Sequence, residues 1–111
     1  MPIPKIDAAN AKKPLGYDPA RKKYILFEEI IAGREHIIPV DTLSDEDFKN
    51  LVIERQLSGP DYHVQSISGQ PMSRDDVVNA IRLNQPFGRM TLEAEKSYLR
   101  DLQSDIQKNL K

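Results

Sequence analysis

Apolar and polar positions alternate with a helical period from Asp18 to Gly33. Asp18 stands where an N-cap residue would stand, Pro19 suits a first helical position, and Gly33 suits the position after a last turn. At about 100° per residue, one face collects the large apolar side chains and the other collects charged ones. The apolar face comprises Tyr24, Leu26, Phe27, Ile30 and Ile31. The pattern predicts a helix over about 19–32.

The same stretch has a second interpretation as strands. The β-branched and aromatic residues of 24–31 could form one strand, which would turn at Ala32 and Gly33 into a second strand over 36–40. The fold would then be α+β with a hairpin at about 24–40. Strand alternation, however, would place one glutamate on each face beside apolar residues. We therefore favour the helix.

Two further helix starts carry a capping signal. Ser44 and Ser73 are each followed three positions later by an aspartate, as in a capping box, and then by an apolar stripe. These signals predict helices over about 45–57 and about 74–84, and Pro86 is expected to end the second one.

The two capped segments also resemble each other. A shift of 29 positions places 43–59 over 72–88 with five identities. The matched pairs are Ser44 with Ser73, Asp47 with Asp76, Asn50 with Asn79, Gln56 with Gln85, and Gly59 with Gly88. Capping chemistry explains two of the five. We interpret the similarity as a recurring helix signal, with a duplicated helical unit as the alternative.

The C-terminal segment carries a narrow apolar seam, which predicts a helix over about 92–110. The seam consists of Leu92, Leu99, Leu102, Ile106 and Leu110. Packing onto other helices of the same chain is the simpler interpretation, because little over two heptads is too short to stand alone. The alternative is an intermolecular zipper, which makes these five residues candidates for partner binding.

Composition narrows the possible chemistry. The chain has 111 residues, a formal net charge of -1, 39% hydrophobic residues and no cysteine. Its length suits one small domain. Without cysteine there can be no disulfide, no thiolate metal site and no cysteine nucleophile.

The near-zero net charge hides an uneven distribution. Residues 1–23 hold six positive and two negative side chains, whereas residues 41–85 hold four positive and eight negative ones. The sequence thus predicts an extended basic arm over 1–17, in which Lys12 and Lys13 are candidate partner contacts. No apolar run has the length of a signal peptide core or of a membrane span. We expect a cytoplasmic protein with no membrane contact.

Catalytic and cofactor motifs are weakly supported. His36 and His63 are the two imidazoles of the chain, and no serine stands in a nucleophile elbow. Isolated glycines do not form a phosphate-binding loop. Asp61 and His63 could contribute to a metal site, but two ligands are fewer than the three or four protein ligands that zinc usually takes. We expect no enzyme activity and no cofactor, with a metal-dependent protein built around Asp61 and His63 as an alternative.

Nucleic-acid binding is the other alternative. Helices 74–84 and 92–110 could form a helix-turn-helix pair in a DNA-associated regulator. The expected connection over 85–91 is longer than the usual turn of about 3–4 residues. The second helix also mixes acidic and basic side chains, which makes nucleic acid an unlikely partner.

The sequence as a whole predicts a small, mainly α domain of four helices over 18–111, preceded by the basic arm. Its expected function is a non-enzymatic protein interaction module, such as a small adaptor, regulator or accessory subunit. It would act through helix faces and the arm. The partner would be another protein or a second copy of the chain.

Overall fold

Four α-helices dominate the computed structural model, which describes residues 12–58, 63–65 and 71–110. The elements run in the order β1 (Gly16–Asp18), β2 (Lys23–Ile25), α2 (Phe27–Ile31), the 3-10 turn η1 (Val40–Thr42), α3 (Asp45–Ser58), β3 (His63–Gln65), β4 (Pro71–Ser73), α4 (Arg74–Arg82) and α5 (Pro86–Leu110). The strands form two small antiparallel pairs, β1 with β2 and β3 with β4. The expected mainly α class is confirmed.

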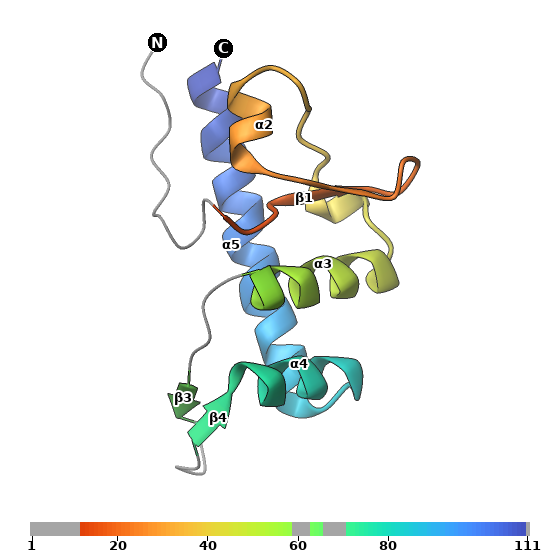
Figure 1. Ribbon diagram of the computed structural model, residues 1–111, viewed down its shortest axis with the longest axis vertical. Helices are drawn as coiled ribbons and strands as arrows, with labels where there is room; N and C mark the ends of the chain where they lie inside the picture. The colour runs from red at the N-terminus through yellow and green to blue at the C-terminus, as the bar shows by residue number, and fades with distance from the viewer. Residues whose placement is uncertain (1–11, 59–62, 66–70, 111) are drawn as a thin grey trace.

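Helix α5 is the longest element and runs along the long axis of the molecule, whose extents are 45 × 28 × 19 Å (Figure 1). Helix α3 crosses it near the middle, and α4 crosses it near its N-terminal end. A single hydrophobic cluster joins these layers. Its fully buried apolar members are Leu15, Ile25, Leu51, Val52, Ile81, Leu99 and Ile106.

The segment expected to be one helix over 19–32 is mostly something else. A hairpin pairs Gly16 with Ile25 and Asp18 with Lys23, and only Phe27–Ile31 is helical. Asp18 accepts a hydrogen bond of 3.0 Å from the backbone N–H of Ala20, so the Asp-Pro pair starts a turn instead of capping a helix.

Packing favours this hairpin over both interpretations of the sequence. The rings of Tyr17 and Tyr24 contact each other across the two strands in a tilted arrangement, with centroids 4.9 Å apart, and Leu15 and Ile25 are fully buried. The alternative hairpin over about 24–40 was also wrong, because the partner of β2 lies before it in the chain.

The hairpin also moves the end of the expected basic arm to an earlier residue than 17. Pro14 and Leu15 are buried, and Gly16–Asp18 forms β1. The end of the expected arm over 1–17 is therefore part of the folded domain. Residues 1–11 lie outside the described part of the chain.

The predicted capping signals are confirmed. The backbone N–H of Asp47 donates to Ser44 Oγ over 3.1 Å at the start of α3, which spans Asp45–Ser58. At the start of α4, Ser73 and Asp76 exchange two hydrogen bonds of 3.0 and 3.2 Å, a complete capping box.

The two capped segments diverge after their first turns. Helix α3 has 14 residues, whereas α4 has 9 and ends at Arg82. Gln56 is buried in α3, whereas its aligned counterpart Gln85 is exposed in the turn after α4. Gly88 lies inside α5, and its counterpart Gly59 lies outside the described residues. The structure that the two segments share is the serine cap at the start of each helix.

The junction of α4 and α5 differs from the expected one. Helix α5 begins at Pro86, where proline occupies a first helical position, and not near residue 92. Asn84 adopts a left-handed φ of 55°, and Gln85 N–H donates to Ala80 O over 2.9 Å. A Cβ on Gly88 would lie 2.2 Å from that same Ala80 oxygen. Helix α5 therefore turns closely against the end of α4 because residue 88 has no side chain.

Candidate interaction groove

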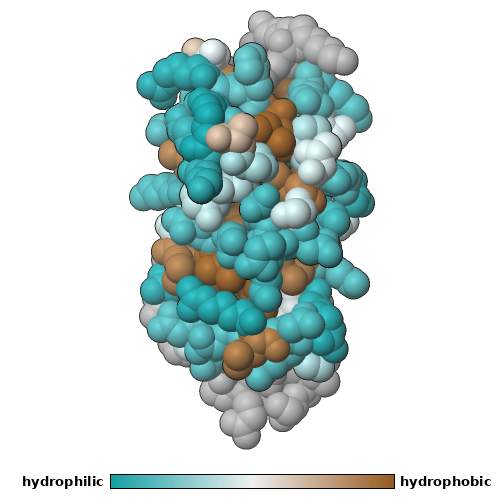
Figure 2. All heavy atoms as spheres, turned by 90° about the vertical axis from the view of Figure 1, so that its right-hand side faces the viewer, coloured by the Kyte–Doolittle hydropathy of each residue, from teal (hydrophilic) through white to brown (hydrophobic). Residues whose placement is uncertain are grey.

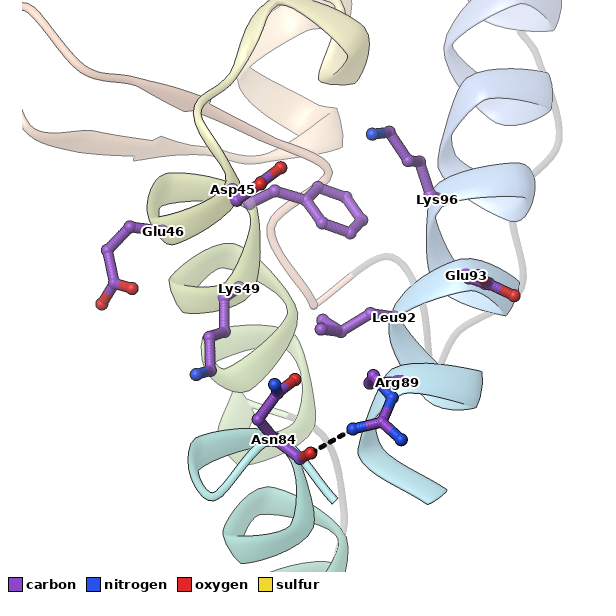
Figure 3. Close-up of a pocket in the computed structure, with 9 residues that line it drawn as sticks. Asp45, Glu46, Lys49, Asn84, Arg89, Leu92, Glu93 and Lys96 are labelled. Carbon is purple, nitrogen blue, oxygen red and sulfur yellow. Dashed lines mark hydrogen bonds between the residues drawn. The ribbon is translucent and has the colours of Figure 1, made fainter. Parts of the chain in front are cut away.

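A groove of about 570 Å³ opens between the N-terminal half of α3, the α4–α5 turn and the first half of α5 (Figure 3). Its lining combines two apolar side chains with seven polar or charged ones. The residues are Asp45, Glu46, Phe48, Lys49, Asn84, Arg89, Leu92, Glu93 and Lys96. The N-terminal end of α3 and the α4–α5 turn lie on the right-hand side of Figure 1. Figure 2, which shows that side, has apolar atoms at the surface between hydrophilic ones.

The floor of the groove is apolar. Phe48 from α3 and Leu92 from α5 are its two apolar lining residues, and Leu92 points from α5 toward α3 (Figure 3). Phe48 belongs to the hydrophobic cluster at 6% exposure, and the half-buried Leu92 packs against that cluster. The groove floor is thus the outer edge of the core, which gives it a rigid base.

Basic side chains reach into the space from both helices. Lys96 Nζ lies 5.5 Å from the centroid of the Phe48 ring, within cation–π distance. Arg89 Nη1 donates to the carbonyl of Asn84, and Lys49 Nζ donates to the carbonyl of Arg82 over 3.3 Å. The first of these two bonds connects α5 to the α4–α5 turn, and the second connects α3 to the end of α4, so they fix one end of the groove.

The carboxylates are arranged differently. The carboxylates of Glu46 and Glu93 point outward, away from the space between the two helices, whereas that of Asp45 lies on the side of α3 that faces α5 (Figure 3). The inner surface of the groove therefore carries more positive than negative charge, although the charges of all nine lining residues sum to zero.

The predicted seam of the last helix lies mainly in the core. Leu99 and Ile106 are fully buried, and Leu92 and Leu102 are partly buried against the same cluster. Leu110 ends α5, and its side chain lies outside the described part of the structure. The seam packs within the chain, as the simpler interpretation expected. Leu92 alone of these residues lines the groove.

The other predicted residues that the structure describes are not among those that line the groove. Lys12 is exposed and Lys13 is half-buried near the start of the described chain. His36 is exposed. His63 is in β3, and Asp61 lies outside the described residues. Within 12–58, 63–65 and 71–110, no three histidine or acidic side chains come together as a metal site.

Sequence reasoning missed the groove because its halves are far apart in the chain. One signal was available: Arg89, Leu92 and Lys96 have helical i, i+3, i+7 spacing and share one face of α5. The opposing wall, with Phe48, became visible only when α3 was placed against that face.

An ion-pair cluster fastens the hairpin to the loop after α2. The side chain of Glu35, 6% exposed, pairs with Arg21, and with Lys23 Nζ over 2.8 Å. Hydrogen bonds from Arg21 and then Lys23 lower the pKa of Glu35 to about 2. Hydrogen bonds to Glu35 and then to Glu29 raise the pKa of Lys23, and the bond from Lys23 lowers the pKa of Glu29. Each charge of the cluster is satisfied locally, which indicates a structural role.

A second polar cluster joins the layers from inside. The guanidinium of Arg55, 1% exposed, donates to Glu95 over 2.6 Å and to Pro14 O over 2.9 Å. It also lies 5.6 Å from the Tyr98 ring centroid. These contacts bind α3 to α5 and to the N-terminal segment, so this cluster also holds the fold together.

None of the described helices has both the length and the apolar character needed to cross a membrane. Comparison with protein-family models, with curated proteins and with solved structures gives no match for this chain.

Proposed function

We propose that the protein is a non-enzymatic protein–protein interaction module, a small adaptor, regulator or accessory subunit, that binds a partner protein through the groove between α3 and α5. The observation that carries the proposal is the groove, in which the buried Phe48 and the half-buried Leu92 lie within a frame of charged side chains. Protein interfaces commonly combine an apolar anchor site with a polar rim.

The size and rigidity of the groove support this proposal. A volume of about 570 Å³ accommodates one or two large side chains of a partner and falls in the range of ligand pockets. The two walls are helices that share one core, so little ordering is needed on binding. Lys12 and Lys13 remain proposed additional contacts, and the cytoplasmic location expected from the sequence remains part of the proposal.

Position-specific crosslinking tests the proposal. A photoreactive amino acid replaces Glu46 or Glu93 at the groove rim, or Asp75 on α4 as a control, whose side chain is 79% exposed. In cells of the source organism, both groove positions are expected to give the same adduct, and the control position is expected not to give it. Equal adducts from all three positions, or none from the groove positions, would contradict the proposal. An adduct with the mass of two chains would identify a second copy as the partner.

One observation favours a second candidate function, a DNA-associated regulator. The connection between α4 and α5 is Leu83–Gln85, three residues, which suits a helix-turn-helix and removes the length argument against it. The mixed charge along α5 still opposes phosphate binding. An electrophoretic shift with random duplex at low salt tests this candidate. No retardation at micromolar protein would exclude it.

A further inference from the structure

We propose that the groove selects an acidic peptide segment that carries a large apolar side chain, an inference that rests on the proposed function and specifies its ligand.

The first argument is the charge inside the groove. Lys96 points toward α3 from α5, and Arg89 lies at the turn end of the groove together with Lys49 (Figure 3). Of the three carboxylates in the lining, those of Glu46 and Glu93 point away from the space between α3 and α5. Lys49 is directed to the Arg82 carbonyl, so a ligand between the helices meets the cations of Lys96 and Arg89 and the anion of Asp45, which favours an acidic ligand over a basic one.

The second argument is the placement of these cations around the floor. The Lys96 ammonium lies above the Phe48 ring, so a carboxylate that pairs with it brings the neighbouring ligand residue to the edge of the apolar floor. Arg89 uses one N–H on Asn84, and a guanidinium has five N–H donors, so it can also bind a carboxylate. The arrangement fits an apolar side chain flanked by acidic ones.

Two exposed apolar side chains are chain neighbours of residues at the turn end of the groove. Leu83 and Met90, which adjoin Asn84 and Arg89 in the chain, are 68% and 52% exposed. A peptide longer than its anchor residue would cover this surface too. A small anionic molecule that fills only the groove would leave it open, which favours a peptide as the ligand.

Selection of a random peptide library on the folded protein tests the inference. We expect enrichment of peptides with aspartate or glutamate next to tryptophan, phenylalanine or leucine. Enrichment of apolar anchors with basic or neutral neighbours would overturn the acidic preference but leave the proposed interaction function in place. Failure to enrich any peptide, together with absence of a groove-specific crosslink, would overturn both.

Charge variants then locate the binding site. By fluorescence polarisation, Arg89→Glu and Lys96→Glu are each expected to weaken the most enriched peptide about tenfold or more. Lys108→Glu, at an exposed position near the end of α5 and outside the groove lining, is expected to change affinity less than about threefold. Arg89→Gln and Lys96→Gln serve as milder variants if a reversal lowers the helical circular dichroism. If neither the Arg89 variants nor the Lys96 variants change the affinity for the peptide, the proposal is contradicted.

Two competing ligands are outcomes of the same experiments. Random duplex DNA that displaces the labelled peptide and loses its own binding in Lys96→Glu would assign the groove to nucleic acid. Concentration-dependent dimerisation in sedimentation that Lys96→Glu abolishes would assign it to a second copy of the chain. Either result would overturn the peptide proposal.

Discussion

Gln103 Nε2, in the last helix, donates a hydrogen bond of 3.0 Å to the backbone carbonyl of Leu15, 88 positions earlier in the chain. The same amide donates to Ile38 O over 3.2 Å, and its oxygen accepts from Val40 N–H over 3.1 Å. Gln103 is 4% exposed. One buried amide therefore satisfies backbone groups of both the N-terminal segment and the loop before α3, and holds them against α5.

Replacement of this amide should be costly. In Gln103→Leu, three backbone groups lose their partner in a buried site, and we expect a loss of about 3 kcal/mol in the free energy of unfolding. Urea denaturation followed by circular dichroism measures it. Gln107→Leu, one turn later and exposed, is the matched control and should change stability by less than about 0.5 kcal/mol. Equal effects of the two variants would show that the buried amide is not a tether.

The α4–α5 junction should not tolerate a side chain at Gly88. Alanine in a helix is favoured over glycine by about 1 kcal/mol. Its Cβ would, however, lie 2.2 Å from the backbone oxygen of Ala80. We expect Gly88→Ala to lower the free energy of unfolding by about 2 kcal/mol, because the two helices must separate.

Gly16→Ala is the control for this variant. The nearest atoms to a Cβ at Gly16 lie 3.8 Å away, an ordinary contact distance. Its thermal midpoint should therefore stay close to that of the wild type, well above that of Gly88→Ala. A Gly88→Ala protein as stable as the wild type would contradict the observed helix packing.

Acid should weaken the fold partly through Glu35. Hydrogen bonds from Arg21 and Lys23 lower the pKa of Glu35 to about 2 from its ordinary 4.5. A lowered folded-state pKa means that the stabilisation is fully present above about pH 4.5 and is lost as the pH falls toward 2. The urea midpoint should therefore fall across this range.

Glu35→Gln isolates the contribution of that carboxylate. The variant should be less stable than the wild type at neutral pH and should lose less stability between pH 5 and pH 2. Glu28→Gln, at an exposed position in α2, should keep the wild-type pH profile. Parallel profiles for Glu35→Gln and the wild type would rule out this ion-pair cluster as a source of acid sensitivity.

The buried pair of Arg55 and Glu95 should matter more than the exposed pair of Arg100 and Asp41. In Glu95→Ala, the guanidinium keeps its burial but loses the carboxylate at 2.6 Å, and we expect a destabilisation of about 3 kcal/mol. The double variant Arg55→Met with Glu95→Ala should recover part of this loss, because no buried charge remains.

The exposed pair provides the comparison. The guanidinium of Arg100 and the carboxylate of Asp41 form two hydrogen bonds of 2.7 and 2.9 Å, with side chains 54% and 51% exposed. Asp41→Asn should have a much smaller effect than Glu95→Ala, because water and salt screen this pair. Chemical denaturation of the wild type, Glu95→Ala, the double variant and Asp41→Asn ranks their free energies of unfolding. A larger loss in Asp41→Asn than in Glu95→Ala would contradict this prediction.

The sequence by itself determined the starts of α3 and α4. Ser44 and Ser73 were identified as caps, and both accept the expected hydrogen bond. Capping depends on groups within one helical turn, so no distant residue is needed to decide it. The mainly α class follows from the same local chemistry, combined with apolar residues at helical spacing.

Tertiary contacts decided the places where one local signal allowed two structures. Asp18 before proline suits a helix start and a turn equally, and the buried Leu15 and Ile25 selected the turn. Pro86 can follow one helix or begin another, and the contact of Gly88 with Ala80 accompanies the second outcome.

The groove also belongs to the tertiary structure. Lys96 and Leu92 could be assigned to one helix face from their spacing, but nothing in that spacing identifies Phe48 as the opposing residue. The fold decided this pairing, because apolar side chains from distant segments come together only when the core excludes water.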